Sequence, residues 1–127
     1  MSVEGNKKSC QRCFDEIWNK GDLSVIPELI SSDYVAHNRQ GDVKGIANFE
    51  QGVKNYLSGM PDMHWTIEQM IGEGDFLAIR LRLTGTFTGK IGDNEPTGEK
   101  VDGEFVLINR YVDGKCVEAT PFGTSAN

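Results

Sequence analysis

Hydrophobic and polar residues alternate almost without interruption over residues 75–89. Leu77, Ile79, Leu81 and Leu83 occupy one set of alternate positions, and arginines and threonines occupy much of the other. A period of two over this length predicts a long β-strand with one apolar face. Gly85 interrupts the apolar row, which indicates a bulge or bend. Such a strand requires neighbouring strands and a layer packed on its apolar face.

Four further segments have strand patterns: residues 34–38, 64–71, 101–112 and 115–123. Polar segments rich in turn residues separate them: 39–44, 72–75, 90–100 and the Asp113-Gly114 pair. The short turns at 72–75 and at Asp113-Gly114 are typical of β-hairpins. From residue 64 onward, the pattern therefore predicts a meander of long antiparallel strands.

Three segments near the amino terminus have the spacing of amphipathic helices. Apolar residues recur at intervals of three and four from Cys10 to Trp18, and Gly21 can end this helix. A second, short helix is expected at 23–30 and a third at 45–58. Helices followed by strands predict an α+β fold. We expect one domain over residues 1–127, with the helices and a curved sheet enclosing an apolar pocket.

The net charge of −6 argues against nucleic acid or an anionic membrane as the main partner. The sequence has no signal-peptide pattern and no apolar run of about 20 residues, so we expect a cytoplasmic protein. Cys10 and Cys13 form a C-x-x-C pair on the apolar helix face, and Cys116 lies in a late strand. The sequence offers no βαβ context for a redox motif and no second ligand pair for zinc. The cysteines are therefore interpreted as core residues.

Several short motifs occur in an order that resembles a known family. They are FDEIWNKGD at 14–22, YVAHN at 34–38, TGTFTG at 84–89, PTG at 96–98 and DGK at 113–115. Together they resemble the SnoaL-like polyketide cyclases of the nuclear-transport-factor-2-like superfamily. The resemblance implies a cone-shaped α+β barrel with a deep apolar cavity. It also implies an intramolecular aldol closure by acid–base residues, with no metal or cofactor.

The sequence departs from the family at the usual acid–base pair. The Thr-Gly-Thr-x-Thr-Gly segment usually carries a histidine at x, where this chain has Phe87. Aligning Cys116-Val117-Glu118 to the last-strand motif places Pro121 where an Asp is usual. We expect Phe87 and Pro121 to face the cavity, where neither can move a proton. A register shift of one residue could instead bring Glu118 inward.

His37 and Asn38 leave the first strand at the expected cavity mouth. His37 could act as a base near neutral pH and Asn38 could donate to an oxyanion, although a loop histidine and turn chemistry explain them as well. Asn109 and Gln69 share faces with apolar residues, so both are expected ligand contacts, and Asn109 is a second candidate for the oxyanion donor. For Asn109 a bond within the protein is an alternative, and for Gln69 outward exposure.

Four aromatic residues could line the pocket and stack on a planar ligand, or serve as plain core: Trp18, Tyr34, Tyr56 and Trp65. On the opposite sheet face, cross-strand ion pairs or a subunit interface would explain Arg80 and Arg82. Val106 and Ile108 also point outward, together with Val112, which predicts that a second subunit covers this face in a homodimer.

These observations give three functional hypotheses. The first is a cofactor-free cyclase or isomerase that acts on a small apolar carbonyl-bearing molecule. The second is a non-catalytic binding protein that uses the same pocket. The third is an association module whose cavity is filled by side chains.

Overall fold

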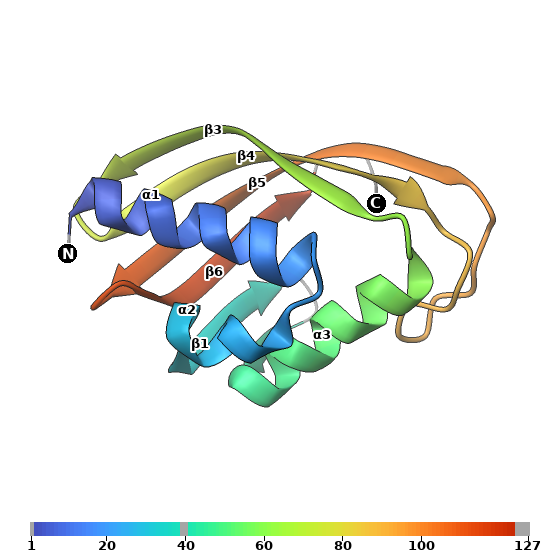
Figure 1. Ribbon diagram of the computed structural model, residues 1–127, viewed down its shortest axis with the longest axis horizontal. Helices are drawn as coiled ribbons and strands as arrows, with labels where there is room; N and C mark the ends of the chain where they lie inside the picture. The colour runs from blue at the N-terminus through green and yellow to red at the C-terminus, as the bar shows by residue number, and fades with distance from the viewer. Residues whose placement is uncertain (1, 39–40, 124–127) are drawn as a thin grey trace.

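The computed structural model describes residues 2–38 and 41–123 (Figure 1). Its elements, in chain order, are α1 (Val3–Arg12), the π-helix η1 (Cys13–Trp18), the 3-10 helix η2 (Leu23–Val25), α2 (Ile26–Leu29), β1 (Ile30–Asn38), β2 (Gly41–Lys44), α3 (Ile46–Gly59), β3 (His64–Glu73), β4 (Phe76–Thr86), β5 (Lys100–Val112) and β6 (Lys115–Gly123). This order confirms the predicted α+β class.

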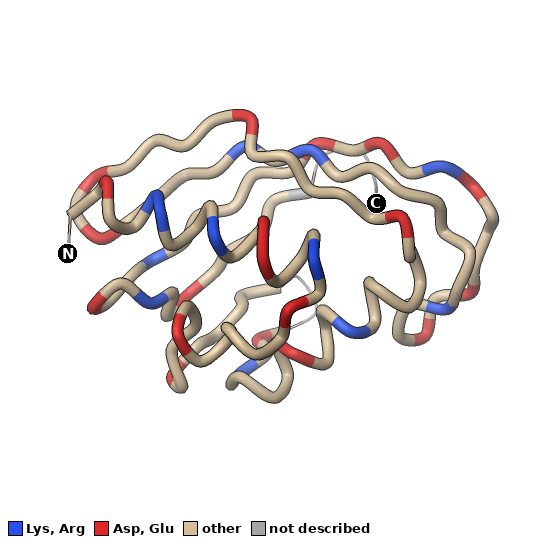
Figure 2. The backbone as a smooth tube through the Cα atoms, viewed as in Figure 1, with Lys and Arg blue, Asp and Glu red and all other residues tan. Residues whose placement is uncertain are grey.

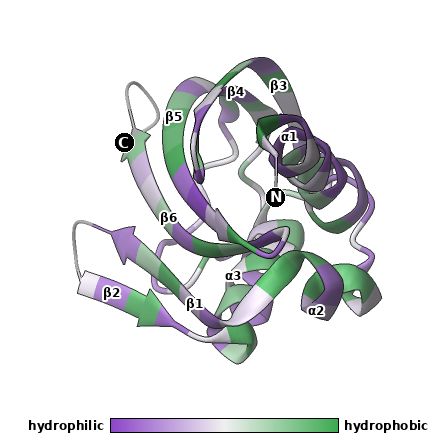
Figure 3. Cartoon of the chain, turned by 90° about the vertical axis from the view of Figure 1, so that its left-hand side faces the viewer, coloured by the Kyte–Doolittle hydropathy of each residue, from purple (hydrophilic) through white to green (hydrophobic). Residues whose placement is uncertain are grey.

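The strands form one sheet in the order β2-β1-β6-β5-β4-β3. All neighbouring pairs are antiparallel except β1 and β6, which run parallel. The sheet curves, and the helices lie on its concave side (Figures 1 and 3). The parallel pair was not predicted, because the sequence pattern specifies strands but not which distant strands become neighbours.

β4 is the strand predicted from the alternating pattern. Leu77, Ile79, Leu81 and Leu83 are buried in the concave face. The pairing of β4 with β5 runs without a register shift through Gly85. A Cβ at Gly85 would lie 3.3 Å from the Met63 Cα, so a tight backbone approach, and not a bulge, favours glycine there.

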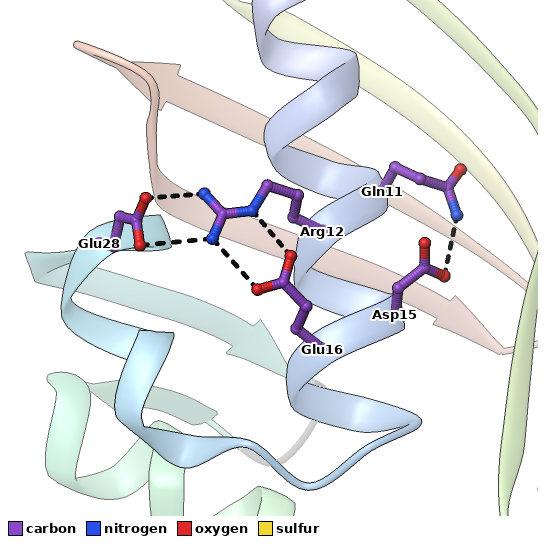
Figure 4. A network of polar contacts seen from close by, with 5 residues as sticks. All are labelled: Gln11, Arg12, Asp15, Glu16 and Glu28. Carbon is purple, nitrogen blue, oxygen red and sulfur yellow. Dashed lines mark hydrogen bonds and ion pairs between the residues drawn. The ribbon is translucent and has the colours of Figure 1, made fainter.

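The first helix begins earlier than predicted, at Val3, because the Ser2 side chain caps it by accepting a hydrogen bond from the Gly5 N–H at 2.9 Å. It continues into η1, and Gly21 ends it with a φ of 72°. Figure 4 shows Arg12 bonded to Glu16 and to Glu28 of α2, both at 2.7 Å. This partly exposed network joins the two helices.

The polar segment predicted as a loop at 39–44 contains β2, which pairs with β1 from Val35–Lys44 to Asn38–Gly41. β2 was missed because it is a short, mostly exposed edge strand without an apolar face. β1 also begins at Ile30, where the second helix was expected to end.

Gln69 lies on the opposite face from the one predicted. A register shift between Ile67 and Gln69 places Gln69 opposite Arg80, on the outer face, and Met70 opposite the buried Ile79. A bulge adds one residue to one strand, so every side chain beyond it changes face. Gln69 is therefore not a contact of the cavity, in agreement with the alternative of outward exposure.

Acidic and basic residues are interspersed along the helices and strands (Figure 2). On the outer sheet face Arg82 pairs with Asp102 at 2.8 Å and Arg80 with Glu104 at 3.7 Å. Both are cross-strand ion pairs of the kind predicted from the sequence. No helix within the described residues is long and apolar enough to cross a membrane.

Candidate ligand-binding cavity

A cavity of about 710 Å³ lies between the helices and the concave face of the sheet. Most of the predicted contacts belong to its lining, namely Trp18, Tyr34, Asn38, Tyr56, Trp65, Asn109 and Pro121. Residues that were not predicted also line it, among them Phe14, Phe49, Phe105, Tyr111 and the three cysteines. The cavity is thus not filled by side chains, which removes the hypothesis of a purely structural module.

Aromatic rings form much of the cavity wall. The Trp18 ring lies 5.7 Å from the Trp65 ring and 5.9 Å from the Tyr56 ring, between centroids. The Trp65 ring in turn lies 5.8 Å from that of Phe105. These rings therefore pack on one another as core residues do, and they also line the cavity. The two roles considered for them, core residue and pocket lining, apply at the same time.

The π-helix η1 positions part of this wall. Its wider turn is marked by the Asn19 N–H, which donates to the Phe14 carbonyl five residues back at 2.8 Å. Cys13, Phe14 and Trp18 all lie in η1 and line the cavity. The sequence predicted a helix here but gave no signal for the π geometry.

Asn19 holds η1 to β3 and was missed as a functional residue. Its Nδ2 donates to the Trp65 carbonyl at 2.9 Å, and its Oδ1 accepts from the Trp65 N–H at 2.7 Å. The amide thus occupies both backbone groups of Trp65 on an edge strand. Its position just before the helix-ending Gly21 was the one available signal.

The polar groups in the cavity are few and uncharged. Asn109 is 6% exposed, and its Nδ2 donates to the Tyr111 hydroxyl at 3.3 Å. The Asn109 Oδ1 and the Trp65 Nε1 have no hydrogen-bond partner. Among the described lining residues there is no Asp, Glu, His, Lys or Arg. The cavity therefore offers amide, indole, hydroxyl and thiol groups rather than ionic ones.

Burial keeps the hydroxyls and thiols protonated. It raises the pKa of the Cys10 thiol to about 11, and it also raises the pKa values of Cys13 and Cys116. The phenol pKa values of Tyr34 and Tyr111 are raised for the same reason. Near neutral pH these groups can share hydrogen bonds but cannot serve as strong bases.

His37 faces away from the cavity. Successive strand residues point to opposite faces, so Asn38 lines the cavity whereas His37 lines a second pocket, of about 570 Å³, on the outer face. The His37 Nε2 lies 2.8 Å from Glu118 and its Nδ1 lies 2.9 Å from Asp42. These bonds, that to Glu118 first, raise the pKa of His37. The expected base therefore has both ring nitrogens engaged outside the cavity.

The two positions of the usual acid–base pair have different surroundings. Pro121 lines the cavity as predicted. Phe87 follows the end of β4 and packs against Met60, Met63 and Leu83, outside the cavity lining. Its backbone pairs with residues of the following loop, which directs the side chain toward this smaller cluster.

Glu118 does not turn inward. It lies opposite Arg110 in the β5–β6 register and forms an ion pair with it on the outer face. Hydrogen bonds from Arg110 and His37 lower the pKa of Glu118. The β5–β6 pairing does shift register next to this position, between Arg110 and Tyr111, but Glu118 still faces the outer side.

A curved sheet and the helices on its concave side, around an uncharged cavity with aromatic walls, define a class of small α+β proteins. The sequence model of one such family, the SnoaL-like polyketide cyclases, matches residues 8–122. The chain belongs to this SnoaL-like polyketide cyclase family. No curated protein matches the chain significantly.

Solved structures agree with this assignment. A protein of Jannaschia sp. CCS1, proposed to be a SnoaL-like polyketide cyclase, has a TM-score of 0.87 and 26% identity, over 97% of this chain and 89% of that chain. AclR of Streptomyces galilaeus, proposed to be a hydroxylase, has a TM-score of 0.81 and 29% identity, over 97% and 81%. IdmH of Streptomyces antibioticus, proposed to be a polyketide cyclase, shares the fold, with a TM-score of 0.77 and 22% identity over 93% and 91%.

Proposed function

We propose that the cavity binds a small, mainly apolar, carbonyl-bearing molecule. Its volume of about 710 Å³ falls within the range of small-molecule pockets. Its walls combine aromatic rings with two unpartnered polar atoms, the Asn109 Oδ1 and the Trp65 Nε1. Apolar walls with a few fixed polar groups are the usual composition of such sites.

The uncharged lining of the cavity is the observation that favours binding without proton transfer. General acid–base catalysis near neutral pH needs a group whose pKa lies near that pH, within hydrogen-bond reach of the reacting proton. The described lining residues include no carboxylate and no histidine. Its phenols and thiols have pKa values shifted upward, away from neutrality.

Ring closure of a carbonyl-bearing substrate is the second candidate function, and membership of the family favours it. In an aldol closure, a carbon next to one carbonyl loses a proton and attacks a second carbonyl. Here the cavity would contribute by holding the chain of the substrate folded, which alone can accelerate an intramolecular step. The Asn38 amide and the unpartnered Trp65 Nε1–H are the donors available to bond the developing oxyanion.

Thermal shift and fluorescence titration with planar apolar ketones test the proposal. The chain's two tryptophans, Trp18 and Trp65, both line the cavity, so a bound ligand should change their emission. Ligand at 100 times its Kd should add about 2.7 kcal/mol to the unfolding free energy. Failure of every probe to raise Tm would overturn the proposal.

A matched pair of variants locates the bound molecule. Ala119 lines the cavity, whereas the neighbouring Thr120 lies opposite Ile108 on the outer face. Ala119→Phe should abolish binding and Thr120→Phe should leave it intact, with circular dichroism confirming that both variants fold. Product analysis with the wild-type protein then separates the two functions: conversion of a dicarbonyl probe supports ring closure, and its unchanged recovery supports binding alone. Conversion that persists in His37→Ala would show that ring closure does not need His37.

We further propose that the outer sheet face forms a homodimer. Phe122 is 53% exposed and lies opposite Val106, and Ile108 and Val112 follow farther along β5 on the same face. Adjacent exposed apolar side chains are typical of association surfaces. Sedimentation should give a dimer that Phe122→Glu converts to a monomer, whereas Ser58→Glu on exposed α3 should not. A monomeric wild-type protein would contradict this proposal.

A further inference from the structure

Four buried side-chain polar atoms in the described residues lack a hydrogen-bond partner: both amide atoms of Asn6, the Trp65 Nε1 and the Asn109 Oδ1. Buried polar groups are nearly always paired in folded proteins, because an unpaired one loses its bonds to water without replacement. Asn6 lies outside the cavity lining, but Trp65 and Asn109 belong to it. The cavity wall therefore carries one unused donor and one unused acceptor.

One hydrogen bond distinguishes the two amide atoms of Asn109. The Nδ2 donates to the Tyr111 hydroxyl oxygen at 3.3 Å. The Oδ1 is buried and has no partner. The free atom of Asn109 is thus an acceptor, not the oxyanion donor expected from the sequence.

The unused donor and acceptor lie apart along β5. Asn109 and Phe105 point to the same face four residues apart, which separates them by about 13 Å. The Trp65 ring lies next to Phe105, with 5.8 Å between ring centroids. A ligand that meets both unused atoms must therefore be elongated, and the aromatic wall between them suits a flat molecule.

We propose that Asn109 and Trp65 select and orient the ligand: an elongated, flat, apolar molecule with a hydroxyl at one end and a carbonyl at the other. The hydroxyl donates to the Asn109 Oδ1, and the carbonyl accepts from the Trp65 Nε1–H. This inference rests on the proposed binding function. It adds that a free hydroxyl, and not only apolar area and a carbonyl, is required at the Asn109 end.

Three related compounds test the requirement by isothermal titration calorimetry: 4′-hydroxyflavone, 4′-methoxyflavone and flavone. Each has the flat skeleton and the carbonyl, but only the first has the donor at the far end. The wild-type protein should bind 4′-hydroxyflavone about 10-fold more tightly than the other two, because they leave the buried acceptor unpaired. Asn109→Leu should remove this preference by weakening the hydroxyl compound only. Asn55→Leu, on the exposed surface of α3 and outside the cavity lining, should retain it.

Trp65→Phe provides the second arm, because it removes the N–H and keeps an aromatic ring. It should weaken all three compounds by a similar factor and leave the preference for the hydroxyl intact. Equal affinity of the wild-type protein for the three compounds would overturn this inference while leaving the binding function standing. If none of the three binds, the inference falls together with the flat-ketone form of the proposed function. The wild-type comparison decides the matter even where a variant does not fold.

Discussion

Replacing Asn19 by alanine tests whether one side chain holds the aromatic wall in place. The Asn19 amide makes two hydrogen bonds to the backbone of Trp65, at 2.7 and 2.9 Å, in a partly buried position. A hydrogen bond of this kind contributes about 0.5–1.5 kcal/mol net, so losing both should cost about 1–3 kcal/mol. For a chain of this length, Tm falls by roughly 3–6 °C for each kcal/mol of stability that is lost.

Urea denaturation followed by tryptophan fluorescence measures this cost, and ligand titration measures its effect on the cavity. Asn55→Ala is the matched control, because the Asn55 amide bonds only Gln51 on the exposed surface of α3. It should change stability by less than about 0.5 kcal/mol. Asn19→Ala should also weaken ligand binding, since Trp65 loses its anchor. A stability change equal to that of Asn55→Ala would refute the role assigned to Asn19.

Three further predictions concern pH and glycine. The bonds of His37 to Glu118 and Asp42 raise its pKa above the ordinary 6.5, so their stabilisation is fully present below about 6.5 and is lost as the pH rises through the folded-state pKa. The fall in Tm over that interval should therefore be smaller in His37→Gln. Gly52 lies within α3 with open space at its Cβ position, so Gly52→Ala should stabilise by about 0.5–1 kcal/mol in urea denaturation. Gly85→Ala, against a close backbone, should instead destabilise by about 1–3 kcal/mol.

The sequence predicts well wherever a regular period runs unbroken. The alternation in β4 correctly assigned its buried and exposed faces, and the same rule placed Asn109 on the cavity side of β5. Helical spacing likewise placed Cys10 and Trp18 on the cavity side of the first helix. In each case burial of one face is a strong and local constraint, so the pattern of residue types records it directly.

Prediction failed where one extra residue changes the strand period, or where contacts between distant segments determine the structure. The bulge before Gln69 reversed the face of that residue, and nothing in the local sequence marks it. The two hydrogen bonds of Asn19 to the backbone of Trp65 join η1 to β3, which are 46 residues apart in the chain at these positions. Such contacts arise from tertiary packing and have no periodic signature.

The faces of β1 and β6 decide how the chemistry of this chain should be approached. At both strands the ionisable residue points outward while its neighbour in sequence lines the cavity: His37 beside Asn38, and Glu118 beside Ala119. Moving either ionisable group inward would need the strand to slip by one residue. That slip would also turn the buried side chains of the strand outward. Because Glu118 is held by both His37 and Arg110, the ion pairs themselves oppose such a slip. Any reaction in this cavity must therefore draw on substrate positioning and neutral hydrogen bonds rather than on His37 or Glu118.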